Sequence, residues 1–208
     1  RDAWQFVDEA SERANQAEAV NTISRTADGK LRGDNTDGPG LVNDLLQNLG
    51  WPINDRKILV IGAGGAVSGV LASLLAEAPG VLHVTNRTHA KAQVLEKNFA
   101  GATAVAIDRL QGSYDLVING TSAGLSHQDL EITGSVITGN TRCYDMIYGS
   151  GTTRFNQWCQ KQADCDVADG LGMLVEQAVL AFMIWFGGQV NTAPDTQSVI
   201  NTIRNNLD

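Results

Sequence analysis

The chain has 208 residues and a formal net charge of −8, and 43% of its residues are hydrophobic against 18% charged. This composition is typical of a globular protein of one or two domains and excludes a disordered chain. The acidic balance argues against nonspecific nucleic-acid binding, which needs a basic surface.

The first quarter of the chain predicts a helix, a hairpin, a polar loop and a second helix. Apolar residues recur at helical spacing over 1–19, although no helix start signal precedes them. Strand-like segments at 19–25 and 31–33 flank a turn at 27–30 and predict a β-hairpin. The loop GDNTDG follows at 33–38, and the apolar spacing over 41–49 then predicts a helix closed by Gly50.

From Lys57 onward, strand patterns alternate with helix patterns. Continuous apolar runs bounded by glycine predict buried parallel strands. We expect strands at 57–62, 81–85, 102–107, 114–120 and 142–148, with helices between them and two final helices at 170–185 and 196–207. The fold class predicted is α/β, with a Rossmann-like doubly wound parallel sheet.

A glycine-rich turn lies between the strand at 57–62 and the next helix, and it reads Gly62-Ala63-Gly64-Gly65-Ala66. Glycines here let the backbone approach a pyrophosphate, and the helix N-terminus supplies free N–H groups. The third position of the dinucleotide pattern is Ala66-Val67 and not a strict glycine. We expect a bound dinucleotide; the alternative is a tight turn without a ligand.

The residues after the second strand indicate which dinucleotide binds. An NAD site usually has an acidic residue here for the ribose 2′-hydroxyl, whereas this sequence has Asn86, Arg87 and Thr88, with Lys91 one turn later. Arg87 can bind a 2′-phosphate and Lys91 adds positive charge. NADP(H) is therefore favoured, and the alternative is that both cations belong to a solvated helix start.

Asp37, in the polar loop ahead of a helix, is the best candidate for a catalytic carboxylate. Aspartate also caps helices and fills turns, so a structural role competes with catalysis. Other polar candidates are Asn21, Tyr148 and Gln177, which lies among apolar residues and needs a hydrogen-bond partner from protein or ligand if buried. We interpret His83, within a strand, as structural.

Three cysteines without paired spacing, Cys143, Cys159 and Cys165, predict reduced thiols; we expect no disulfide framework and no metal site. The longest apolar run, 178–186, is too short for a membrane span, and no signal peptide is visible. We expect a cytoplasmic monomer or homodimer with a small-molecule substrate and without nucleic-acid or membrane partners.

Seven motifs in order along the chain closely resemble shikimate dehydrogenase: AVNT, GDNTDG, GAGGA, NRT, NGTSAG, YDMIY and ADGLGMLVEQA. The resemblance implies a two-lobed α/β protein with an NADP-binding Rossmann domain and a substrate lobe. It implies reversible NADPH-dependent reduction of 3-dehydroshikimate to shikimate, a step of aromatic amino-acid biosynthesis.

Residue by residue, the resemblance assigns roles to matching positions. It implies substrate contacts for Asn21, Asp37, Tyr148 and Gln177, and an acid–base role for Asp37. It implies that Met146 and Gly170 line the nicotinamide end. The full implied cofactor set is Glu12, Gly62, Ala63, Gly64, Gly65, Ala66, Asn86, Arg87, Thr88, Lys91, Thr121, Ser122, Met146, Gly170 and Met173.

The sequence departs from the family at its beginning. The family's catalytic lysine lies in a VPFK-type motif just ahead of the first helix, and this sequence has no lysine before Lys30. We therefore expect a family member cut after that lysine, with an N-terminal remnant at 1–37, a connection at 38–54, the Rossmann domain at 55–169 and C-terminal helices at 170–208. Such a chain binds NADP(H) but turns over poorly, because an acid–base group contributes about 10²–10⁴-fold.

Two other functions compete with this one. The missing lysine allows a catalytically silent NADP-binding module that acts as a sensor or scaffold. A quinate/shikimate dehydrogenase shares the same motifs and accepts NAD, although Arg87 argues against that cofactor.

Overall fold

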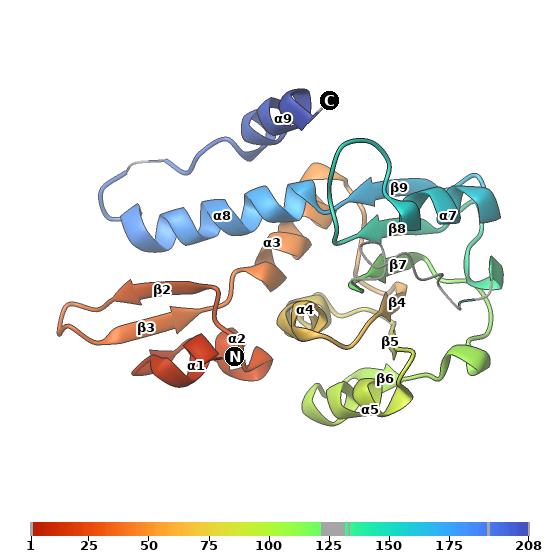
Figure 1. Ribbon diagram of the computed structural model, residues 1–208, viewed down its shortest axis with the longest axis horizontal. Coiled ribbons are helices and arrows are strands. Elements are labelled where there is room, and N and C mark those ends of the chain that lie inside the picture. Colours follow the sequence, from red (N-terminus) through yellow and green to blue (C-terminus); the bar gives the residue numbers. More distant parts are fainter. Residues whose placement is uncertain (1, 122–131, 133, 191, 208) are drawn as a thin grey trace.

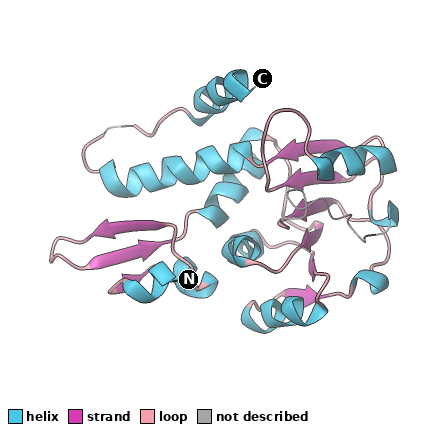
Figure 2. Ribbon diagram, in the orientation of Figure 1, coloured by secondary structure: helices cyan, strands magenta, loops and turns pink. Residues whose placement is uncertain are grey.

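The computed structural model describes residues 2–121, 132, 134–190 and 192–207. The described strands form a three-stranded sheet, in the order β1-β3-β2, and a six-stranded sheet, in the order β6-β5-β4-β7-β8-β9. Figure 1 places the small sheet at one end of the molecule and the large sheet at the other, and Figure 2 shows helices between and around them.

The small sheet confirms the hairpin but corrects the first helix. Strands β2 (Thr22–Arg25) and β3 (Leu31–Asp34) pair antiparallel, and β1 (Glu9–Ala10) adds to β3 in parallel. The single helix expected over 1–19 is wrong, because β1 separates α1 (Asp2–Phe6) from α2 (Glu12–Ala17). The Asp8 carboxylate accepts the backbone N–H of Leu31, and Ser11 caps α2. These bonds to the neighbouring strand override the helical spacing.

The large sheet is parallel throughout and doubly wound, as predicted. The strand order reverses at β4: β5 and β6 lie on one side of it, and β7, β8 and β9 lie on the other. The expected strands at 102–107 and 142–148 are shorter in the structure, and the strand at 166–169 was not expected. The strands are β4 (Lys57–Ile61), β5 (Val81–Thr85), β6 (Ala102–Ala104), β7 (Leu116–Asn119), β8 (Arg142–Asp145) and β9 (Asp166–Asp169).

Helices cover both faces of this sheet. Alternate residues of β4 point to opposite faces: Ile58 and Val60 pack with α4, whereas Leu59 and Ile61 pack with α7. Both faces are buried, which explains the continuous apolar runs. No helix among the described residues is long and apolar enough to span a membrane. The remaining elements are α3 (Asp37–Asn43), η1 (Asp44–Asn48), α4 (Gly65–Ala76), α5 (His89–Asn98), η2 (Ile107–Arg109), η3 (Gly134–Val136), α7 (Arg154–Gln162), α8 (Leu171–Phe186) and α9 (Thr196–Leu207).

The core between the large sheet and α7 contains all three cysteines. Cys143 lies in β8, Cys159 in α7 and Cys165 just before β9, and each thiol is buried. The sulfur atoms of Cys143 and Cys165 are 3.9 Å apart.

Candidate active site

A hydrogen-bond network lies where β2, α3 and α8 meet. The Asn21 side-chain amide donates to the Asp37 carboxylate at 2.8 Å and to the Thr36 hydroxyl at 3.0 Å. The Thr36 hydroxyl in turn lies 3.3 Å from the side-chain oxygen of Gln177. The structure thus brings together three residues singled out from the sequence, Asn21, Asp37 and Gln177.

Thr36 is the member of this network that the sequence pattern did not single out. It is fully buried and also donates its backbone N–H to the Asn21 side-chain oxygen at 3.0 Å. Its place inside the GDNTDG loop is the signal that could have identified it, since a threonine next to a candidate carboxylate offers both a donor and an acceptor.

Gly40 allows α3 to approach α8 closely at this site, and α4 lies within ordinary contact distance of Asp37. A Cβ on Gly40 in α3 would lie 2.8 Å from the backbone nitrogen of Gln177, so α3 packs backbone against backbone on α8. A Cβ on Gly69 in α4 would lie 3.7 Å from the Asp37 carboxylate. The carboxylate therefore faces the helix that follows the glycine-rich turn.

The surroundings of Asp37 distinguish it from a helix cap. It is the first residue of α3, and neither it nor the N-cap residue Thr36 caps that helix through its side chain. Burial raises the pKa of Asp37, and the hydrogen bond from Asn21 only partly opposes this effect. A buried carboxyl group with a raised pKa holds its proton more readily than an exposed one, which is a property of groups that exchange protons with a substrate.

The glycine-rich turn connects β4 to α4 as the sequence predicted. Gly62 has φ of +119°, a backbone conformation that favours glycine, and its N–H donates to the Thr85 carbonyl at 2.8 Å. Gly64 and Gly65, at the start of the 12-residue helix α4, are exposed, and a Cβ on either would meet open space. The first N–H groups of α4 are thus available to an anion.

A cavity of about 330 Å³ opens beside this turn. Gly64 and Gly65 line one side and Lys91 of α5 lines another, while Gln16 of α2 and Glu18, the residue that follows α2, also line the cavity. Helix N-terminal N–H groups and a lysine form a donor set that fits phosphate groups, so these residues fit the NADP(H) expected from the sequence.

The residues expected to select the 2′-phosphate lie together where β5 meets α5. Arg87, Thr88 and Lys91 are exposed there, and the Asn86 side chain donates to the Thr88 carbonyl at 3.0 Å. The described part of this junction, 85–91, contains no carboxylate.

The other predicted residues divide into two groups. Met146 and Gly170 directly follow the carboxyl ends of β8 and β9, and Thr121 is the second residue after β7; all three lie at the same edge of the sheet as the glycine-rich turn. Met173 instead packs into the main core at 8% exposure. Ser122 lies outside the described residues.

Glu12 and Tyr148 lie apart from these groups. Glu12 lines a separate depression with Arg13 and Arg32, and not the cavity beside the glycine-rich turn. Tyr148 is 43% exposed beyond the end of β8 and does not take part in the Asn21–Thr36–Gln177 network.

Known proteins match this arrangement over nearly the whole chain. Residues 44–129 match the family model of shikimate/quinate 5-dehydrogenase, and residues 170–200 match that of the shikimate 5′-dehydrogenase C-terminal domain. The shikimate dehydrogenase (NADP(+)) of Hydrogenovibrio crunogenus is 47% identical, with 98% of this chain and 73% of that protein aligned.

Two crystal structures share the fold. An Ael1 enzyme from Pseudomonas putida is 38% identical with a TM-score of 0.89, covering 97% of this chain and 73% of that one. Shikimate 5-dehydrogenase from Thermus thermophilus, in complex with NADP(H) and shikimate, is 31% identical with a TM-score of 0.84, covering 98% and 74%. The chain therefore belongs to the shikimate dehydrogenase family.

Proposed function

We propose that this chain carries out the NADPH-dependent, reversible reduction of 3-dehydroshikimate to shikimate. The observation that carries the proposal is the network of Asn21, Thr36, Asp37 and Gln177, which faces α4 just beyond the glycine-rich turn. A polar substrate held by this network lies close to a cofactor held at the N-terminus of α4. The resemblance of the whole chain to NADP-dependent shikimate dehydrogenases supports the same reaction.

The substrate roles follow from what each side chain can donate or accept. The amides of Asn21 and Gln177 each offer a donor and an acceptor, which suits the hydroxyl groups of a cyclic polyol acid. Asp37 accepts hydrogen bonds when ionised and donates one when protonated. We assign Tyr148, which is 43% exposed, to the rim of the same site.

When bound, NADPH supplies the hydride. The chain has to bind NADPH and discriminate against NADH, which lacks the 2′-phosphate. We assign the pyrophosphate to the N–H groups at 62–66 and the 2′-phosphate to Asn86, Arg87, Thr88 and Lys91. Thr121, Ser122, Met146 and Gly170 are assigned to the nicotinamide end. Glu12, which lines the separate depression, and Met173, which packs in the core, are assigned more remote roles in cofactor binding.

Reduction of a ketone to an alcohol consumes one proton at the carbonyl oxygen. Asp37 is placed to exchange that proton, because burial raises its pKa and Asn21 holds its carboxylate in one orientation. In the reverse direction the ionised carboxylate accepts the proton of the substrate hydroxyl group.

The proposed division of labour follows the two sheets. We assign 55–169 to cofactor binding and 1–37 to the substrate lobe, with 38–54 as the connection. We assign the helices at 170–208 to the substrate lobe as well: α8 reaches the small sheet, where the Trp185 indole donates to the Ile23 carbonyl at 2.9 Å. Helix α9 packs on α8, and its Arg204 binds Asp169 of β9.

Product analysis tests this function. The chain is incubated with 3-dehydroshikimate and NADPH, and shikimate is identified by mass and retention time. We expect shikimate to form with NADPH, more slowly with NADH, and about 10²–10⁴-fold more slowly in Asp37→Asn. A chain that binds NADPH but forms no shikimate above the protein-free blank would contradict the proposal and favour a silent NADP-binding module.

A further inference from the structure

The last residues of three neighbouring strands form a row across the large sheet. Asn119 ends β7, Asp145 ends β8 and Asp169 ends β9, and they are register partners in the order Asn119, Asp145, Asp169. Asn119 and Asp145 are each 1% exposed, and the Asp169 side chain is 7% exposed. Buried polar groups in such a row need hydrogen-bond partners.

Each member of this row holds the loop that follows it by the same bond. The side-chain oxygen accepts the backbone N–H two residues later: Thr121 for Asn119, Ile147 for Asp145 and Leu171 for Asp169, each at 3.2 Å. An aspartate or asparagine that bonds its own backbone in this way fixes the direction in which the chain turns. The three loops therefore leave the sheet in the same direction.

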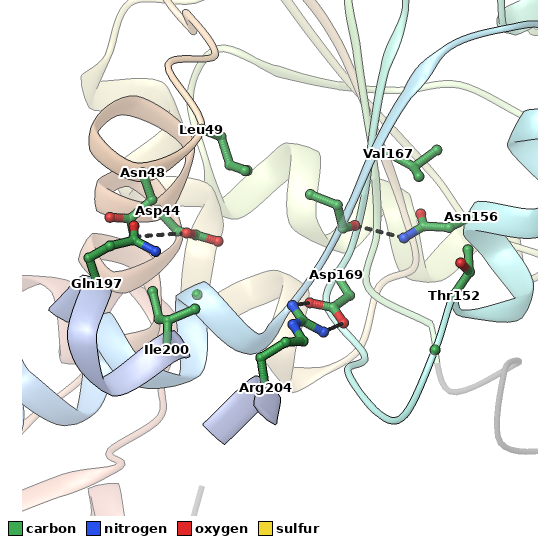
Figure 3. A pocket seen from close by; sticks show the side chains of 13 residues that line it. Asp44, Asn48, Leu49, Thr152, Asn156, Val167, Asp169, Gln197, Ile200 and Arg204 are labelled. Carbon is green, nitrogen blue, oxygen red and sulfur yellow. Dashed lines mark hydrogen bonds and ion pairs between the residues drawn. The ribbon is translucent and has the colours of Figure 1, made fainter. Parts of the chain in front are cut away.

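The row is also connected sideways. The Asn119 amide donates to the Asp145 carboxylate at 2.9 Å. At the other end, Arg204 of α9 binds Asp169 through two hydrogen bonds of 2.6 and 2.7 Å, and Figure 3 shows its guanidinium pointing at that carboxylate. A bidentate arginine–carboxylate ion pair is among the strongest polar contacts in proteins.

The residues in the middle of the three turns pack against one another. A Cβ on Gly120 would lie 3.0 Å from the Met146 sulfur, and a Cβ on Gly170 would overlap the Met146 carbonyl oxygen. A Cβ on Gly62 would likewise lie 3.1 Å from the Gly120 carbonyl group, so the packed row reaches the glycine-rich turn. A shift of one turn therefore displaces its neighbours.

We propose that Asn119, Asp145 and Asp169 are positioning residues, which set the row of turns that supports the nicotinamide end of NADP(H). The proposal deepens the function proposed above and rests on it. The three residues contact the turns at Thr121, Met146 and Gly170 and act through them.

The position of the row in the sheet predicts which part of the cofactor it affects. The row occupies β7, β8 and β9, whereas Arg87 and Lys91 follow β5, on the other side of β4. Loss of a row member therefore moves the surface under the nicotinamide and leaves the 2′-phosphate site in place.

Nucleotide binding to the full chain tests this difference. Asp145→Ala removes the acceptor used by both Asn119 and Ile147. We expect its Kd for NADPH to rise about tenfold or more. Its Kd for 2′,5′-ADP, which lacks the nicotinamide, should stay within about twofold of the unaltered chain. Asp145→Asn keeps the accepting oxygen and should restore most of the NADPH affinity, which a bulk loss of stability would not explain.

Asp166→Ala is the matched control, because it removes an exposed carboxylate from the opposite end of β9. It should leave both Kd values unchanged. If Asp145→Ala does not fold, Arg204→Gln decides by the same criterion, since it removes the Asp169 ion pair at a side chain that is 41% exposed. Equal losses for NADPH and 2′,5′-ADP, or none for either, would overturn this proposal alone. An unaltered chain that binds neither nucleotide would overturn the proposed function as well.

Discussion

The hydroxyl group of Tyr144, fully buried in β8, donates a hydrogen bond of 2.6 Å to the carboxylate of Asp44 in η1. The Asn48 amide donates to the same carboxylate at 2.9 Å. Burial raises the pKa of Asp44, so these two donors are what stabilise a carboxylate only 3% exposed. The contact fixes η1 to β8, the strand next to the edge strand β9 of the large sheet.

Tyr144→Phe should therefore destabilise the chain without changing the shape of its core. The substitution leaves the Asp44 carboxylate buried with one donor fewer, and a loss of this kind costs about 1–3 kcal/mol. Chemical denaturation followed by circular dichroism measures it. Tyr148→Phe, at a residue that is 43% exposed, should change the free energy of unfolding by less than about 0.5 kcal/mol. Equal effects of both substitutions would contradict the importance of the Tyr144 contact.

Asp37→Asn should make the chain more stable at neutral pH. Burial raises the pKa of Asp37 above its ordinary value of 3.8, so its contribution to stability is complete only below that value and is lost as pH rises. Asparagine keeps an oxygen that accepts the Asn21 hydrogen bond and carries no charge. The gain in unfolding free energy should shrink as the pH is lowered toward the ordinary pKa of aspartate, as measured by urea denaturation across pH.

Asp34→Asn, three residues from Asp37, is a control in which the expected change in unfolding free energy has the opposite sign. Burial raises the pKa of Asp34, but hydrogen bonds from Arg13 and Ser11 outweigh it and hold the pKa below 3.8. Its ionised form is stabilising above that value, so Asp34→Asn should lower stability at neutral pH, with the difference vanishing in acid. The same sign for both substitutions would contradict this assignment.

Arg87→Ala should raise the Kd for NADPH far more than the Kd for NADH. The two cofactors differ only in the 2′-phosphate, which Arg87 can bind through two parallel hydrogen bonds. Isothermal titration with each nucleotide measures the ratio of the two Kd values. Lys91→Ala should change the ratio in the same direction by a smaller factor, because lysine contributes a point charge. A ratio unchanged in Arg87→Ala would contradict NADP selection at this position.

Gly40→Ala should separate α3 from α8. The added Cβ would lie 2.8 Å from the backbone nitrogen of Gln177, and overpacking of this kind costs about 1–3 kcal/mol. The Thr36–Gln177 contact should weaken with it, so shikimate binding measured by calorimetry should fall along with the thermal midpoint. Gly149→Ala, where a Cβ meets open space, is the control and should leave both quantities unchanged.

Sequence patterns were sufficient where local and tertiary preferences agree. The apolar run KILVI predicted β4 because both faces of that strand are buried. The pattern over 1–19 failed because bonds to β3 interrupt a stretch with helical spacing. Strand β9 was missed because its sequence DVAD is only partly buried at the edge of the sheet.

In the candidate site, too, the sequence predicted residues that lie in local motifs and missed those that depend on tertiary contacts. Motifs identified Asn21, Asp37 and Gln177, but Thr36 became visible only when β2, α3 and α8 were placed together. The row of Asn119, Asp145 and Asp169 depends on strand register, which spacing along the chain does not encode. A single sequence therefore does not predict which residues of neighbouring strands contact each other.

The burial of all three thiols in one core gives the chain an intrinsic reporter of local opening. Burial raises the pKa of Cys165 to about 12, and Cys143 is completely enclosed, so neither sulfur reacts readily while α7 covers the strands. Alkylation of the native chain then proceeds only through fluctuations that lift α7 from β8 and β9. Its rate measures how often that face of the sheet opens, and NADP(H) should slow it by stabilising the same strand ends.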